Sequence, residues 1–252
     1  MYAWKCWRET RARFIALLIL FAAIAILVTL APGLKERNGS WYFDRSEYTH
    51  DLGLLSLSIV GPMILSCLWG SGCVSAALLG VTAPGSEIEP GTIEYLWTRP
   101  RRRAIFHWTH WSICAAEIIA VAAVPTYAAA ALLGALTGFW NQPLLLLAPW
   151  LMALVGLPIL GLAVLMTAFR RSASGGLIFT SGVVVAYVTL RQIATGPLHI
   201  HIPPLFMEPV AWMMNYYTPA RMTFPWGGLT RAVVLAAAFP LCAQYVLKRS
   251  EV

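Results

Sequence analysis

Residues 144–169 read LLLLAPWLMALVGLPILGLAVLMTAF and contain no charged side chain. A helix needs about 20 consecutive apolar residues to cross the hydrocarbon core of a bilayer. Inside lipid the backbone N–H and C=O groups must bond to one another, because no water is there to bond them. A stretch of this length and composition therefore predicts a membrane-spanning helix, and it decides the class of the fold.

The composition of the whole chain agrees with this interpretation. Of its 252 residues, 59% are hydrophobic and 12% are charged, and the mean hydropathy is +0.68. Soluble domains carry about 25% charged residues, so the composition excludes a water-soluble protein. The net charge of +7 does not indicate a nucleic-acid partner, because the basic residues lie at the ends of apolar runs, as they do in membrane proteins.

Six apolar stretches are long enough to span a bilayer, and they predict an all-α membrane protein with a single domain over residues 1–252. We expect the spans at residues 14–31, 53–82, 105–136, 144–169, 173–190 and 228–247. The first is interpreted as a retained span, because no cleavage pattern of small residues follows it. Prolines inside the spans should kink the helices without ending them; they are Pro62, Pro125, Pro158 and Pro240.

Lysine and arginine are concentrated in four segments, at residues 1–13, 83–104, 170–172 and 248–249. The positive-inside rule places such segments in the cytoplasm, so we expect a multi-pass protein of the inner or plasma membrane with both termini cytoplasmic. Residues 1–13 mix aromatic with basic side chains and predict an interfacial helix on the inner leaflet. Residues 191–227 are interrupted by prolines and predict a re-entrant element at the outer face.

Catalytic and metal-binding motifs are missing from the sequence. It has no phosphate-binding loop, no CxxC spacing and no recognisable set of hydrolase residues, so we expect neither an enzyme nor a metal site. His107 and His110 are three residues apart on one expected helix, and His199 and His201 lie in the last long loop. Without a nearby carboxylate or a third histidine, each pair is better explained as interfacial or loop histidines than as ligands.

The segment SEIEPGTIEYLWTRPRRRAIF, residues 86–106, is a dense charged insert between two long apolar runs. Its acids come first and its arginines last, which complements the dipole of a helix. Pro90 suits a first turn, and Pro100 should end the helix before the third span. We expect a short amphipathic helix on the cytoplasmic side; the alternative is a charged loop that only sets the topology.

This insert resembles the segment between the second and third spans of type-2 ABC exporter permeases. That family has an acidic residue, Gly-Thr, a Glu-x-Leu-like stretch, and a proline followed by an arginine. The matching residues here are Glu87, Glu89, Gly91, Thr92, Glu94, Leu96, Pro100 and Arg103. The cluster of three consecutive arginines at the end departs from the family, which usually has a milder stretch there. The match covers about twenty residues by motif and essentially the whole chain by architecture.

The resemblance implies that residues 84–104 form the coupling region, which docks on a separate ATPase subunit that binds ATP and Mg. It also implies a second permease chain, identical or paralogous, and no cofactor in this chain. A secondary carrier, a channel or a non-transport membrane scaffold remains the alternative.

Two further features of the expected spans bear on helix packing and on the pathway. Glu117 is the acid inside an expected span, and an intramembrane carboxyl group is by default a functional candidate. We expect it either to line the substrate pathway or to form a structural hydrogen bond. The second span carries a run of small residues that predicts close contact with another helix: Gly70, Gly72, Ser75, Ala76 and Gly80.

Overall fold

The computed structural model describes residues 2–31, 34–37, 40–43, 70, 72–82, 100–137, 143–195 and 226–249. Five long helices and one hairpin make up most of this part of the chain: α1 (Tyr2–Leu30), β1 (Leu34–Arg37), β2 (Ser40–Phe43), α5 (Pro100–Thr137), α6 (Pro143–Arg170), α7 (Ala173–Thr195) and α9 (Trp226–Arg249). Residues 72–80 form a further helical segment between β2 and α5.

The five long helices are each long and apolar enough to cross a membrane. The stretches that qualify are Ala3–Leu30, Ile105–Leu136, Leu146–Arg170, Ala173–Arg191 and Trp226–Leu247. They coincide with five of the six expected spans, which confirms a helical protein of multi-pass character. The remaining expected span, 53–82, is the second in chain order. The structure describes its last part, where residues 72–80 are helical.

The N-terminal region differs in one respect from the expectation. Residues 1–13 were expected as an interfacial helix distinct from the first span, but α1 runs without a break from Tyr2 to Leu30. No proline or glycine falls within that range, so nothing in the backbone chemistry interrupts the helix. At 1.5 Å per residue the 29-residue helix is about 43 Å long, more than the about 30 Å of a hydrocarbon core, so one end must extend beyond that core.

The first loop after α1 contains a β-hairpin, which the expected all-α architecture did not include. Strands β1 and β2 are antiparallel, with Leu34 opposite Phe43 and Arg37 opposite Ser40. The sequence between the strands is Asn38-Gly39, the pair that most favours a two-residue hairpin connection.

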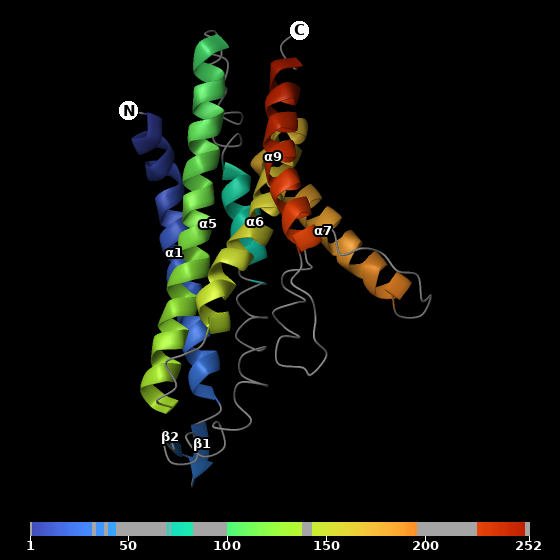
Figure 1. The fold of residues 1–252 in the computed structure, drawn as a ribbon. Coiled ribbons are helices and arrows are strands. Elements are labelled where there is room, and N and C mark those ends of the chain that lie inside the picture. Colours follow the sequence, from blue (N-terminus) through green and yellow to red (C-terminus); the bar gives the residue numbers. More distant parts are fainter. Residues whose placement is uncertain are drawn as a thin grey trace.

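Both chain termini lie at the same end of the molecule (Figure 1). Helices α1 and α5 run side by side and both begin at this end, whereas α6 and α9 both finish there. Val164 and Ala168 of α6 pack on Ala243 and Leu247 of α9. Because these helix ends carry basic residues, the arrangement gathers at one end the positive segments that the sequence assigned to one side of the membrane.

Helix α6 is the centre of the bundle. Of the residues in its most apolar stretch, 78% are buried, against 11% in α7, which diverges from the other helices in Figure 1. The main core joins α1, the 72–80 segment, α5 and α6 through buried side chains such as Leu79, Ile118 and Leu160. Pro125, Pro158 and Pro240 all lie inside helices, as expected; Pro62 is outside the described residues.

The expected close packing of the second span is confirmed at Gly80. A Cβ atom built on Gly80 would lie 2.6 Å from the Cβ of Ala163 and 2.8 Å from the carbonyl oxygen of Leu160. Only a residue without a side chain allows the 72–80 segment to approach the α6 backbone this closely. At Gly70 and Gly72 no described atom lies within 4 Å of such a Cβ, so the close contact is concentrated at one end of the segment.

Candidate functional site

The predicted coupling residues meet the described structure at the start of α5. Pro100 is the first residue of this helix and Arg103 lies in its first turn. The remaining predicted coupling residues lie outside the described residues: Glu87, Glu89, Gly91, Thr92, Glu94 and Leu96. Pro100 was expected to separate the charged insert from the third span, but it opens the helix of that span. A first-turn proline loses nothing, because its missing N–H would have no partner there.

Helix α5 therefore joins residues 100–104 to the apolar span in one continuous helix. It has 38 residues and is about 57 Å long at 1.5 Å per residue, almost twice the thickness of a hydrocarbon core. Its first five residues, Pro100 to Ala104, precede the apolar stretch that begins at Ile105. A displacement of the backbone at Pro100 would move the apolar span directly, without an intervening loop.

Glu117 lies in the interior, where α5 faces α1. Its side chain is 3% exposed, and the Thr10 hydroxyl, which is fully buried, donates a hydrogen bond to Oε1 of Glu117. Oε2 of Glu117 has no hydrogen-bond partner among the described residues. The contact joins two helices far apart in sequence through a polar bond in an apolar core, where an unmade bond would be costly.

Other polar groups extend this junction along the same face of α5. His110 and Cys114 precede Glu117 by seven and three residues, so helical geometry places all three on one side. The Cys114 thiol lies 3.6 Å from the carbonyl oxygen of Leu79 in the 72–80 segment. His110 is fully buried, and neither its ring nitrogens nor the Ser75 hydroxyl has a hydrogen-bond partner in the described part of the chain.

The histidine pair that the sequence placed at the interface is thus divided between two environments. His110 packs edge-on against Phe106, with ring centroids 6.0 Å apart. His107 turns toward α9, and its Nε2 lies 3.0 Å from the carbonyl oxygen of Pro240. Within the described residues no group of three or more His, Cys, Asp and Glu side chains could hold a metal. His199 and His201 lie outside those residues.

The turn of α9 that His107 contacts also packs closely on α6. A Cβ on Gly161 would lie 2.9 Å from the Cβ of Phe239 and 3.1 Å from Cδ of Pro240. Proline within a helix leaves a carbonyl one turn earlier without its usual donor and kinks the axis. The Pro240 turn of α9 therefore meets α5 through a hydrogen bond and α6 through a glycine contact.

A third polar contact joins α5 to α6 at the opposite end of the bundle. The Trp150 indole N–H donates a hydrogen bond of 3.1 Å to the Tyr127 hydroxyl, which donates in turn to the carbonyl of Leu146 at 3.4 Å. Both aromatic side chains are exposed on the outside of the bundle.

Through these contacts α5 forms side-chain hydrogen bonds to three other helices. It is bonded to α1 at Glu117, to α9 at His107 and to α6 at Tyr127. Glu117 stands out in the sequence as a carboxyl group in an apolar run, but Thr10 and the contact of His107 do not, because neither partner lies near in sequence. No family model and no curated protein matches this chain.

Proposed function

We propose that this chain is the transmembrane permease subunit of an ATP-driven transporter of the type-2 ABC exporter kind. The proposal is supported by the multi-pass helical bundle, by the basic segments gathered at one end, and by the charged insert that resembles a coupling helix. In this proposal ATP and Mg bind to a separate nucleotide-binding subunit. A second permease chain, identical or paralogous, completes the pathway within the bilayer.

The observation that carries the proposal is the continuity of α5 from Pro100 through the span. The coupling region, residues 84–104, ends inside this helix. A charged amphipathic segment offers ion pairs and a few apolar anchors to a cytoplasmic partner, and a rigid helix turns its displacement into movement of the span. A flexible loop between the insert and the span would have absorbed that displacement.

The proposed roles follow from the chemistry of the residues. Glu87, Glu89, Glu94 and Arg103 form ion pairs with the cleft of the ATPase subunit, where partial burial strengthens them. Gly91 and Thr92 form the tight entry to the segment, Leu96 is an apolar anchor, and Pro100 starts the lever. Movement of α5 then reaches α1 through the bond between Thr10 and Glu117, and α9 through His107.

Glu117 takes a linking role in this mechanism. Its side chain is buried inside one chain between α1 and α5, whereas the proposed pathway lies between two permease chains. The same bond would keep α1 and α5 together during transport.

Isolation of the complex under mild detergent tests the proposal. We expect the tagged chain to co-purify with a stoichiometric subunit that has a phosphate-binding loop and hydrolyses ATP. Glu94→Lys reverses a charge in the coupling region and Gly91→Trp blocks its tight entry, so each should release that subunit while the chain stays in the membrane. Glu47→Lys, the same charge reversal in the first loop, is the matched control and should retain it.

Two results would contradict the proposal. Recovery of the chain alone, or with partners that lack a nucleotide site, would indicate a carrier, a channel or a scaffold. Retention of the ATPase subunit by both coupling variants would show that residues 84–104 are not its docking site.

A further inference from the structure

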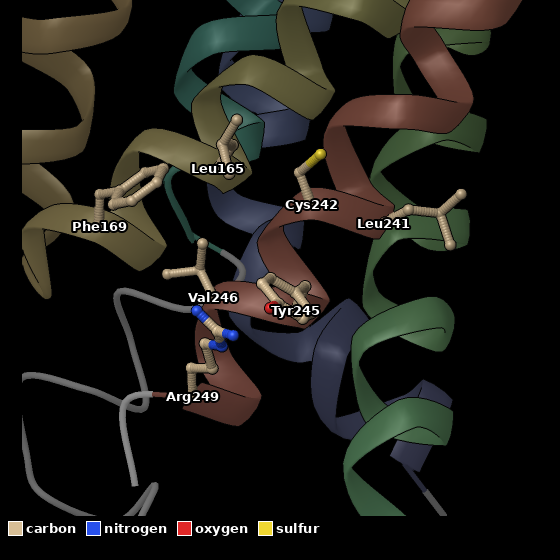
Figure 2. A pocket seen from close by; sticks show the side chains of 7 residues that line it. All are labelled: Leu165, Phe169, Leu241, Cys242, Tyr245, Val246 and Arg249. Atoms are coloured by element: carbon tan, nitrogen blue, oxygen red, sulfur yellow. The ribbon is translucent and has the colours of Figure 1, made fainter. Parts of the chain in front are cut away.

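A groove of about 820 Å³ lies between α6 and α9, close to the ends of both helices. It is lined by Leu165, Phe169, Leu241, Cys242, Tyr245, Val246 and Arg249. Its volume falls within the range of about 300–1,000 Å³ typical of small-molecule sites. Figure 2 shows Phe169 of α6 and Tyr245, Val246 and Arg249 of α9 around the opening.

The lining is apolar except at one end. Leu165 is buried at the base, whereas Phe169 and Tyr245 are more than half exposed at the opening. Arg249 supplies the charge, and it is the last residue of α9, at the end where α6 also finishes. The groove thus has hydrocarbon-like walls along two spans and a cation at their polar end.

The aromatic side of the groove holds this cation in place. The guanidinium carbon of Arg249 lies 4.9 Å from the centre of the Tyr245 ring, a cation–π distance. A guanidinium group that stacks on a ring through its face keeps the N–H donors of its edge directed outward, in the fork that matches phosphate oxygens. Arg249 is therefore positioned to bind an anion next to the apolar groove.

We propose that this groove binds an anionic phospholipid of the surrounding bilayer, with one acyl chain along α6 and α9 and the phosphate at Arg249. The apolar length and single terminal cation match a molecule that is hydrocarbon along its length and negative at one end. A second copy of this chain packed symmetrically here would bring two Arg249 side chains together, and like charges repel. The proposal rests on the membrane-spanning character of the helices and is independent of any ATPase partner.

Lipid titration of the detergent-purified, delipidated chain, with any subunits that co-purify, tests the proposal by native mass spectrometry. Phosphatidylglycerol and phosphatidylcholine with identical acyl chains are the probes. We expect the first phosphatidylglycerol to bind about fivefold more tightly than phosphatidylcholine, as one well-placed basic residue should give. Arg249→Gln should remove that preference. Cys242→Trp should weaken the binding of both lipids, because Cys242 lines the groove at an exposed position and the indole ring would fill it.

Arg170→Gln is the matched control. Arg170 ends α6, and its guanidinium carbon stacks 4.7 Å from the centre of the Phe179 ring, but it does not line the groove. This variant should keep the full preference for phosphatidylglycerol. Equal losses in the two arginine variants would show a general surface-charge effect and overturn the site. Unchanged lipid binding in Cys242→Trp would also overturn it, as would loss of a dimer in that variant without loss of lipid.

Discussion

Replacement of Gly161 by alanine tests whether the contact between α6 and α9 sets the stability of the bundle. The new Cβ would lie 2.9 Å from the Cβ of Phe239 and 3.1 Å from Cδ of Pro240, whereas ordinary contact begins near 3.4 Å. The helices must therefore separate by about half an ångström at this point. The opposing atoms are the Cβ of Phe239 and the Cδ in the ring of Pro240. Both are fixed to the α9 backbone and cannot rotate away.

The expected change in stability is a difference between two terms. Overpacking of a close contact costs about 1–3 kcal/mol, and alanine in place of glycine inside a helix gains about 0.5–1 kcal/mol. We expect Gly161→Ala to lower the free energy of unfolding by about 1 kcal/mol. Gly182→Ala in α7, where no described atom lies within 4 Å of the new Cβ, should raise it by the propensity term alone.

Unfolding in mixed micelles of mild detergent and sodium dodecyl sulfate, followed by circular dichroism, measures both variants against the original chain. The two changes in the free energy of unfolding should have opposite signs, because the variants share the same chemistry and differ only in their surroundings. Equal changes in both, within about 0.5 kcal/mol, would refute the inference that α6 and α9 are in close contact at Gly161.

Four other substitutions test the junctions of α5 and the packing of the second span. In a double-mutant cycle, Thr10→Val and Glu117→Met should show a coupling of about 0.5–1.5 kcal/mol in the same unfolding assay. Additive effects would mean that the hydroxyl and carboxyl groups do not interact. His107→Phe keeps an aromatic ring but loses the hydrogen bond to α9, so it should lower the free energy of unfolding by about 0.5–1.5 kcal/mol. It should also speed amide hydrogen exchange near Pro240, and unaltered exchange would argue against the bond. Gly80→Ala should cost about 1–3 kcal/mol, because it meets a backbone carbonyl, and a gain like that of Gly182→Ala would contradict the close approach.

The spans could be predicted from the sequence because each transmembrane helix satisfies its own backbone hydrogen bonds. Local hydropathy is then enough to locate it, as the agreement between the expected 105–136 and the observed Ile105–Leu136 stretch shows. Hydropathy does not reveal where a helix continues into polar residues beyond its apolar stretch. Residues 100–104 carry the α5 helix beyond its apolar stretch, and hydropathy alone counted them as part of the insert.

The continuity of α1 was missed because the change in composition near Phe14 was interpreted as a boundary. A different signal was present in the sequence. Cys6, Thr10, Leu17 and Phe21 are all buried, and their spacings of four, seven and four residues place them on one helical face across that boundary. The polar Thr10 concealed the pattern, because it contributes nothing to an apolar stripe yet is buried by its bond to Glu117.

The partners of the site residues could not be predicted at all. Glu117 was identifiable as a carboxyl group in an apolar run, but its donor is 107 positions away in sequence. Nothing in a hydropathy pattern states which helices are neighbours. For the same reason His107 and His110 looked equivalent, although one contacts α9 and the other is buried beside Phe106.

Under the proposed function, the positions of these contacts determine how the bundle can move. Helices α5 and α6 are antiparallel, and the hydrogen bond between Tyr127 and Trp150 joins them near the end that lies away from Pro100. Closer to Pro100 the two helices meet through apolar packing, where a Cβ on Gly156 would lie 3.1 Å from Cγ2 of Ile118. Packed apolar surfaces slide past each other more readily than surfaces joined by hydrogen bonds. A push at Pro100 would then swing α5 about the aromatic end, and the bond at Glu117 would make α1 follow.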